Sequence, residues 1–435
     1  MEQTPYRNPR RRRRPRRSKF QIFKEDFLPL IIILATVVTI VILCVGSYQY
    51  YDAPAYNSIQ PEETQDLSAM QQQEAQDLMA QAALLARSYD YMGAINLLTS
   101  FSGDMTTIPG MVEKYEEYGT AYSSLIRYTD LEYIPHLSTG TLISDLDAAL
   151  ADENGDQYNS NFLTTDEFTK ILQALYDRDY VLVSLYDVAK KTMNQDGEFS
   201  ISDGDLLLPE GKKPIILTQI VNGLGNTGFA SRVVLDSSGA LKCEMADGST
   251  GSYDLIPVLN DFVAQHPDFS YCGAKATIAI IGCNGILGHD VSSTEVPAII
   301  DALRADGFDI ACCTYADARY GDMTLEQIQA DMVQWNSQLK PVLGDVDILV
   351  YPNGSDIGTQ EKYSGVIYQY LHDNGLCYFI GQDSDTRAWG QLKDNYLRQT
   401  RRSLAPGIMY YSYSYFEDLF DARSVLDSDR GKIPY

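Results

Sequence analysis

The segment that most constrains this chain is Leu28–Ser47, a stretch of 20 residues that carries no charge and is almost wholly apolar. About 20 such residues span the ~30 Å hydrocarbon core of a bilayer as a helix. The apolar region of a signal peptide is shorter and ends at a cleavage site of small residues, which the sequence around Cys44 does not offer. We therefore predict a single transmembrane helix over residues 28–47.

Charge on the N-terminal side of this segment sets its orientation. Ten of the 34 basic residues precede residue 25, among them the run Arg10–Arg14. Positive flanks stay in the cytoplasm, so residues 1–27 are predicted to be a cytoplasmic tail. The C-terminal domain is then predicted to lie outside the cell, on a single-pass protein of the plasma membrane. The arginine run could also bind anionic lipid or nucleic acid on the cytoplasmic side.

The exported part of the chain is acidic, with 24 basic and 56 acidic residues after residue 47. Such a charge repels nucleic acid, which excludes a nucleic-acid partner for this part. Six of the seven cysteines lie here at irregular spacing and without a C-x-x-C pair. Several of them fall in apolar runs, so buried free thiols are predicted in place of disulfides.

Residues 48–130 have the composition of a helical module. Alanine, glutamine and leucine dominate residues 62–99 without a proline, and Ala83–Leu98 resembles one tetratricopeptide-type helix pair. No second copy follows at a 34-residue period, so a repeat array is not supported. A further helix is predicted over Met111–Arg127. The module is interpreted as a stalk, or as a binding site for a protein partner through residues 60–130.

From about Leu131 the pattern changes to strands that alternate with helices, which indicates an α/β domain. Six apolar runs bounded by turn residues are typical of strands: Tyr180–Ser184, Pro214–Thr218, Ala276–Ile281, Asp309–Cys313, Val346–Tyr351 and Leu376–Ile380. The predicted helices include Glu295–Ala305, Thr324–Leu339 and Ser364–Asn374, and capping-box spacing marks helix starts at Thr164 and Thr324. Consecutive β-α units can close into a barrel whose site lies at the carboxyl ends of the strands.

Several stretches of this domain occur in the order and spacing of a known family: Leu208–Thr218, Gly307–Asp317, Tyr351–Gly354 and Gly407–Ser412. They resemble the motif-bearing segments of polysaccharide deacetylases with a NodB homology domain. The similarity covers residues 131–425 and implies a distorted (β/α) barrel, with residues 426–435 as a C-terminal tail. Members of this family are metal-dependent hydrolases acting on carbon–nitrogen bonds, which remove acetyl groups from N-acetylated sugars.

The first motif of that family, Thr-Phe-Asp-Asp-Gly, supplies a base and a metal ligand. Here Thr218–Gly223 reads Thr-Gln-Ile-Val-Asn-Gly, so Ile220 and Val221 stand at the two carboxylate positions unless a short deletion removed them. An apolar side chain neither accepts a proton from water nor binds a divalent cation. The pattern therefore predicts that the catalytic pair is lost.

The second motif, His-(Ser/Thr)-x-x-His, is matched by Cys313–Asp317, which keeps the hydroxyl residue and the spacing but neither histidine. Cysteine and aspartate both bind metals, so Cys313 and Asp317 are either a remodelled zinc site or a buried thiol beneath a polar rim. Ser412 falls where the family has a histidine that protonates the leaving amine, and serine cannot act as that acid. The resemblance places these residues in the substrate groove: Asp317, Tyr351, Pro352, Asn353, Trp389 and Tyr411.

Histidines are scarce, and we expect three of the four, His136, His266 and His372, to be surface or capping residues. His289 follows a predicted strand and could face the groove. The chain has 31 tyrosines, which either pack in the ordinary way or stack on sugar rings.

Two hypotheses follow. The preferred one is an inactive cell-surface relative of these deacetylases without a cofactor, which binds or scaffolds cell-wall or surface polysaccharide. The alternative is an active metal-dependent deacetylase of N-acetylglucosamine-type carbohydrate, with zinc or another divalent metal on Cys313, Asp317 and His289.

Overall fold

The computed structural model describes residues 61–434 apart from 196, 359–360 and 383–386. The contacts divide the chain after Ser68, and the elements below lie in Ala69–Tyr435 apart from the start of the first helix. The predicted cytoplasmic tail and transmembrane segment, residues 1–27 and 28–47, lie outside the described residues. Within the described part, no helix combines the length and the apolarity needed to cross a bilayer.

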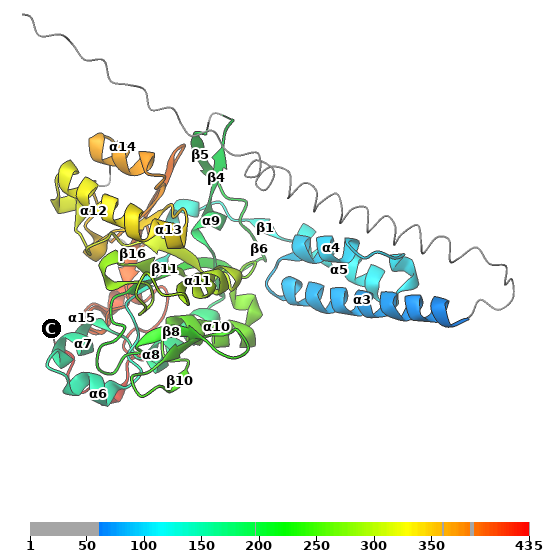
Figure 1. Ribbon diagram of the computed structural model, residues 1–435, viewed down its shortest axis with the longest axis horizontal. Helices are drawn as coiled ribbons and strands as arrows, with labels where there is room; N and C mark the ends of the chain where they lie inside the picture. The colour runs from blue at the N-terminus through cyan, green and yellow to red at the C-terminus, as the bar shows by residue number, and fades with distance from the viewer. Residues whose placement is uncertain (1–60, 196, 359–360, 383–386, 435) are drawn as a thin grey trace, which may run out of the picture. The chain divides into compact units, whose positions relative to one another are not determined.

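The helical module contains α3 (Pro61–Arg87), α4 (Tyr91–Thr99) and α5 (Met111–Ser123), packed together (Figure 1). The predicted helix pair is confirmed, and Asp90 caps α4 by accepting a hydrogen bond of 2.8 Å from the Gly93 amide. The predicted third helix is too long. It ends at Ser123, because Ile126–Arg127 form β1, which pairs antiparallel with β6 (Leu207–Leu208).

Parallel strands close into a barrel in which each strand pairs with the next and β11 returns to β7. In spatial order they are β11 (Thr277–Ile280), β12 (Asp309–Cys312), β13 (Ile348–Val350), β14 (Tyr378–Gln382), β16 (Tyr396–Ser403), β2 (His136–Thr139) and β7 (Lys213–Val221). Two further strands extend this sheet: β3 (Tyr180–Leu182) is parallel to β7, and β15 (Gly390–Lys393) is antiparallel to β16. The predicted (β/α) barrel is therefore present.

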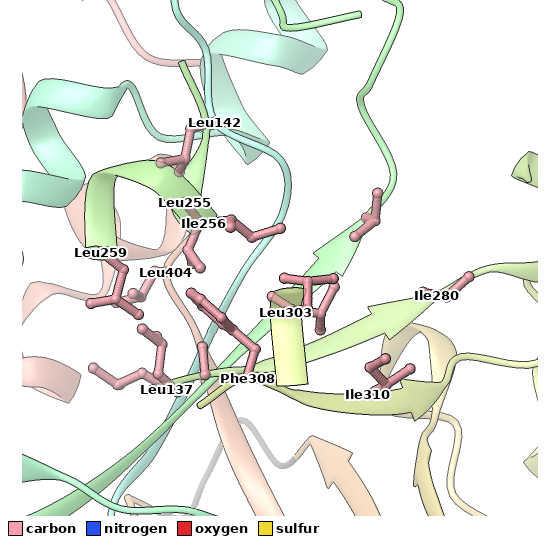
Figure 2. Close-up of a cluster of buried hydrophobic side chains, with 14 of the residues drawn as sticks. Leu137, Leu142, Leu255, Ile256, Leu259, Ile280, Leu303, Phe308, Ile310 and Leu404 are labelled. Atoms are coloured by element: carbon pink, nitrogen blue, oxygen red, sulfur yellow. The ribbon is translucent and has the colours of Figure 1, made fainter. Parts of the chain in front are cut away.

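Helices that follow the strands cover the outside of the barrel (Figure 1): α8 (Thr165–Tyr176), α10 (Leu255–Gln265), α11 (Val296–Ala305), α12 (Leu325–Gln338), α13 (Lys340–Leu343) and α14 (Val366–Asp373). Both predicted capping boxes are confirmed, at the start of α8 and of α12. Strand side chains alternate between the two faces, so Leu137, Ile280 and Ile310 meet helix residues such as Leu259 and Leu303 in an outer core (Figure 2).

The remaining elements are short and lie between these units. They are α6 (Leu146–Ala151), α7 (Gly155–Asn161), α9 (Leu185–Val188), α15 (Pro406–Tyr411), the hairpin β4 (Ala189–Met193) with β5 (Phe199–Asp203), and a small antiparallel sheet of β8 (Arg232–Leu235), β9 (Leu241–Glu244) and β10 (Thr250–Gly251). The small sheet, which inserts between β7 and β11, was not predicted from the sequence.

The helical module joins the barrel through its hairpin turn. We call the second group of packed apolar side chains, to which Ala279, Ala311 and Ile348 of the barrel strands belong, the inner core cluster. Tyr89 is buried within this cluster, and its hydroxyl donates a hydrogen bond of 2.9 Å to the Asp268 carbonyl oxygen. The Cys272 amide donates one of 2.7 Å to the Ser88 carbonyl oxygen. Residues 268–272 precede β11, so the module is attached at the amino-terminal end of the barrel.

The C-terminal segment, predicted to be a tail, is packed into the domain. Arg430 is buried and forms an ion pair with the equally buried Glu167 of α8. Its guanidinium also donates a hydrogen bond of 3.0 Å to the Asn159 carbonyl oxygen of α7. Residues 426–434 are therefore part of the barrel domain.

Candidate functional site

We call the segments that follow the carboxyl ends of the barrel strands the carboxyl rim. Four residues other than glycine adopt a positive φ there: Leu287 (53°), Thr314 (59°), Asp317 (52°) and Asn353 (51°). Such backbone conformations are costly, and they concentrate where a fold holds functional geometry. The rim is therefore the first place to look for a site.

At the end of β7, only one of the two positions at which the resemblance requires carboxylates faces into the barrel. Ile220 packs against the inner core cluster, whereas Val221 belongs to the outer core. Thr218, two residues before Ile220, is also turned inward and is completely buried. The side chains that β7 directs into the barrel here are therefore the hydroxyl of Thr218 and the aliphatic side chain of Ile220. Neither replaces the carboxylates that act as base and metal ligand in the motif.

Beyond β12 lie Cys313 and Asp317, which the structure brings near each other in space. Cys313 is fully buried in the inner core cluster. Burial raises the pKa of its thiol to about 12, with Arg401 lowering and Asp317 raising that pKa. Asp317 is exposed to solvent on one side, while the protein on its other side partly desolvates the carboxyl group and raises its pKa. Cys313 is therefore a protonated thiol beneath an exposed carboxylate.

Asp331 of α12 fixes the backbone of this turn. Its carboxylate accepts hydrogen bonds from the amides of Tyr315 (2.8 Å) and Ala316 (2.9 Å). It also accepts one of 2.7 Å from the buried Tyr320 hydroxyl. Asp331 was not predicted as a site residue, and its place in an amphipathic helix gave no signal.

A polar layer that the sequence did not reveal lies inside the barrel. His136, expected at the surface, is fully buried on β2, with its Nε2 2.7 Å from the Thr218 hydroxyl and its Nδ1 3.3 Å from Oε1 of Gln399. Burial and the charge of Arg401 lower the pKa of His136 to about 3. The ring is therefore neutral: Thr218 donates to Nε2, and Nδ1 donates to Gln399.

Arg401 of β16 carries the fixed positive charge of this interior. Its side chain is 1% exposed, and its guanidinium donates hydrogen bonds of 3.0–3.1 Å to the carbonyl oxygens of Tyr351, Ile380 and Gly381. No carboxylate of the described residues pairs with it, and its Nε has no hydrogen-bond partner there. Burial lowers the pKa of Arg401 to about 10, so it is still charged at neutral pH.

The residues of the rim do not fit a divalent metal. Within the described part of the chain, no three His, Cys, Asp or Glu side chains lie close enough together to hold one. Cys313 and Asp317 supply two donor groups between them, and a structural zinc site takes four ligands. Arg401, which lies close enough to affect the pKa of Cys313, would also repel a cation.

His289, the third ligand of the alternative metal site, is engaged elsewhere. Its Nε2 lies 2.6 Å from the Val233 carbonyl oxygen of β8, and its Nδ1 lies 3.5 Å from the Glu295 carboxylate. Nε2 is hydrogen-bonded to β8 and Nδ1 faces Glu295, so the ring is directed at these groups and not at Cys313 and Asp317.

The groove residues predicted in the Tyr351–Gly354 segment differ in exposure. Val350 faces the interior, so Tyr351 turns to the outer core, where it is fully buried and receives a hydrogen bond of 3.2 Å from Tyr363. Pro352 is buried and Asn353 is exposed. Tyr351, predicted to line a groove, therefore lies in the packed layer beneath the rim.

Trp389 is half-buried, and the Arg398 guanidinium lies 5.1 Å from its ring centroid. Arg398 in turn pairs with Asp356 at 2.8 Å. Trp389, predicted to line the substrate groove, thus stacks on the guanidinium of Arg398.

Tyr411 and Ser412 lie at the end of α15 and line a pocket that neither Cys313 nor Asp317 lines. Both are exposed, and this pocket, of about 580 Å³, lies between α15 and α7. Ser412 follows a helix and not a barrel strand, because it is the residue directly after α15. A second pocket, of about 330 Å³, opens between the ends of β7 and β11, with Asn222, Asn226 and Asn284 in its wall.

No protein-family model and no curated protein matches the chain. Among solved structures, it is similar to a Streptococcus pyogenes deacetylase in complex with acetate, at 13% identity and a TM-score of 0.37, over 66% of this chain and 98% of that one. It is also similar to a polysaccharide deacetylase from Bacillus cereus, at 14% identity and a TM-score of 0.35, over 62% of this chain and 65% of that one.

Proposed function

We propose that this protein is a membrane-anchored, cell-surface protein that binds cell-envelope polysaccharide on a deacetylase-like barrel and does not hydrolyse it. The observation that carries the proposal is the composition of the carboxyl rim. Ile220 is aliphatic and Cys313 is a buried thiol at positions where the resemblance requires a carboxylate and a metal ligand. The buried guanidinium of Arg401 lies close enough to Cys313 to affect its pKa.

Binding is favoured over loss of all function because the rim keeps pockets of ligand size. Ligand sites typically occupy about 300–1,000 Å³, and the two pockets described above have volumes of about 330 and 580 Å³. Their walls carry amide, hydroxyl and aromatic side chains, which suit a neutral sugar, and residues 28–47 anchor the chain in the membrane.

The test uses the full-length protein in detergent micelles. Co-sedimentation with insoluble cell-wall polysaccharide measures binding, release of acetate from N-acetylglucosamine oligomers measures hydrolysis, and elemental analysis measures bound metal. The proposal expects sedimentation without acetate release and without stoichiometric metal. Turnover that a chelator abolishes and zinc restores would establish the deacetylase alternative instead.

A further inference from the structure

The pocket between α7 and α15 has two walls of different chemistry. On α7, Asp156, Gln157, Ser160 and Asn161 line it, and their spacing of i, i+1, i+4 and i+5 puts them on one face of the helix. On α15, Ile408 and Tyr411 line the opposite wall. One side of the pocket is therefore a row of hydrogen-bonding groups, and the other is apolar and aromatic.

Both helices that form the pocket walls are hydrogen-bonded to the C-terminal segment, residues 430–433. The amide of Asn159, on the buried face of α7, donates hydrogen bonds of 3.2 Å to the carbonyl oxygens of Arg430 and Lys432. The Tyr411 hydroxyl donates one of 2.8 Å to the Ile433 carbonyl oxygen. The C-terminal segment thus braces α7 and α15, which lie side by side (Figure 1). A site whose walls are fixed in advance costs less ordering when a ligand binds.

The lining also selects by charge. Asp156 is the only charged residue among the described residues that line the pocket. An anionic ligand would meet a carboxylate and no cation there, which disfavours phosphates, uronic acids and nucleic acid. A neutral ligand with adjacent hydroxyl groups can instead donate two hydrogen bonds to that carboxylate, and charge-assisted bonds of this kind are the stronger ones.

We propose that the α7–α15 pocket binds a neutral segment of polysaccharide, with a sugar ring against Tyr411 and its hydroxyl edge toward α7. A pyranose has an apolar C–H face and a polar rim, which matches the two walls. The amides of Gln157 and Asn161 can both donate to and accept from hydroxyl groups. This inference rests on the proposed function and places its ligand in a pocket that neither Cys313 nor Asp317 lines.

The experiment is calorimetric titration of the full-length protein in micelles with N-acetylglucosamine tetramer, and with a hyaluronan tetramer as the charged probe. We expect the neutral tetramer to bind at least ten-fold more tightly than the charged one. Tyr411→Ala and the double variant Gln157→Ala/Asn161→Ala should each weaken binding by about ten-fold or more. Tyr411→Phe keeps the ring and should stay within about three-fold of the wild type.

Tyr413→Ala is the matched control, because Tyr413 is equally exposed but does not line the pocket. Unchanged circular dichroism spectra and melting temperatures show that the variants fold. If the wild type and the pocket variants bind the tetramer equally well, the tetramer binds elsewhere on the protein. The inference about the α7–α15 pocket then fails, and the proposed function stands. If the wild type does not bind the tetramer but still co-sediments with cell-wall polysaccharide, the pocket inference fails and the proposed function stands. If it binds neither, both fail. Binding at the pocket together with acetate release would keep the site and overturn the inactive assignment.

Discussion

At the scale of single residues, Arg401 shows how a barrel interior can be polar without being a metal site. A buried charge without a counter-ion is costly unless hydrogen bonds replace its hydration. Arg401 obtains three from main-chain carbonyl oxygens, two of them at the end of β14. The guanidinium thus joins the ends of β13 and β14 from within.

We predict that Arg401→Met lowers the free energy of unfolding by roughly 2–4 kcal/mol, because buried carbonyl oxygens lose their charged donor. Urea unfolding of the full-length chain measures the change. Arg423→Met is the control: Arg423 is exposed and stacks on Tyr413, so its loss should change the free energy by less than about 1 kcal/mol. Equal effects of the two variants would show that Arg401 does not brace the barrel.

A second prediction concerns Asp309, which lines a pocket at the amino-terminal end of the barrel. Burial raises its pKa to about 7, with a hydrogen bond from Ser184 lowering that pKa and the charges of Asp187 and Asp347 raising it. The ordinary pKa of the carboxyl group is 3.8, so the folded state holds a proton that the unfolded state releases. Stability from this group is full below about pH 4 and falls as the pH rises to about 7.

Asp309→Asn removes this titration. We expect the variant to exceed the wild type in unfolding free energy at pH 8 by on the order of 3 kcal/mol, with a much smaller difference at pH 4.5. Urea unfolding at both pH values gives the comparison. The same difference at both pH values would mean that Asp309 is ionised in the folded protein throughout.

At the scale of elements, the sequence predicted best where apolar runs mark strands. The predicted strands after residue 213 coincide with β7, β11, β12, β13 and β14. It missed β2 and β16, because His136, Arg398, Arg401 and Arg402 read as surface residues although the fold buries all of them. The hydrogen-bond partners of these side chains lie in distant parts of the chain, so the local sequence does not indicate that the side chains are buried.

The turn after β12 illustrates the same limit and gives a third prediction. Asp331→Ala removes the acceptor for the amides of Tyr315 and Ala316, so these amides should lose protection from hydrogen exchange by at least ten-fold, with roughly 2–3 kcal/mol of stability lost. Asp322→Ala is the control, since the contacts of Asp322 are an ion pair with Arg319 and a hydrogen bond of 3.4 Å from the Ser355 hydroxyl, both at the surface and neither to the turn. If the Tyr315 and Ala316 amides stay protected in Asp331→Ala, the Asp331 carboxylate is not what holds this turn.

At the scale of the whole molecule, the helical module and the barrel share a core. Tyr89 adopts a φ of 67° and fills a position in the inner cluster. The idea of a simple stalk did not include this contact, because a tyrosine in a helix turn carries no signal of a partner 179 residues away. The interpretation of residues 60–130 as a docking site for a protein partner stays a prediction.

We predict that Tyr89→Ala separates the unfolding of the two parts. Removing the ring leaves a cavity and costs roughly 3 kcal/mol, so the melting curve should broaden or divide, and proteolysis near residues 124–130 should accelerate several-fold. Calorimetry and limited proteolysis measure this, with the exposed Tyr115→Ala as the control. A single sharp transition at the wild-type temperature would show that the parts are already independent.

The attachment of the helical module also has a mechanical consequence. If residues 28–47 hold the chain in a membrane, tension enters the barrel through the Ser88–Tyr91 turn and the pairing of β1 with β6. Both contacts lie at the amino-terminal end, ahead of β11 and β7. A load applied there runs along the closed ring of strands before it reaches the carboxyl rim. If polysaccharide binds at the carboxyl rim, as proposed above, tension from the membrane therefore acts on the opposite end of the barrel from the pocket that holds the polysaccharide.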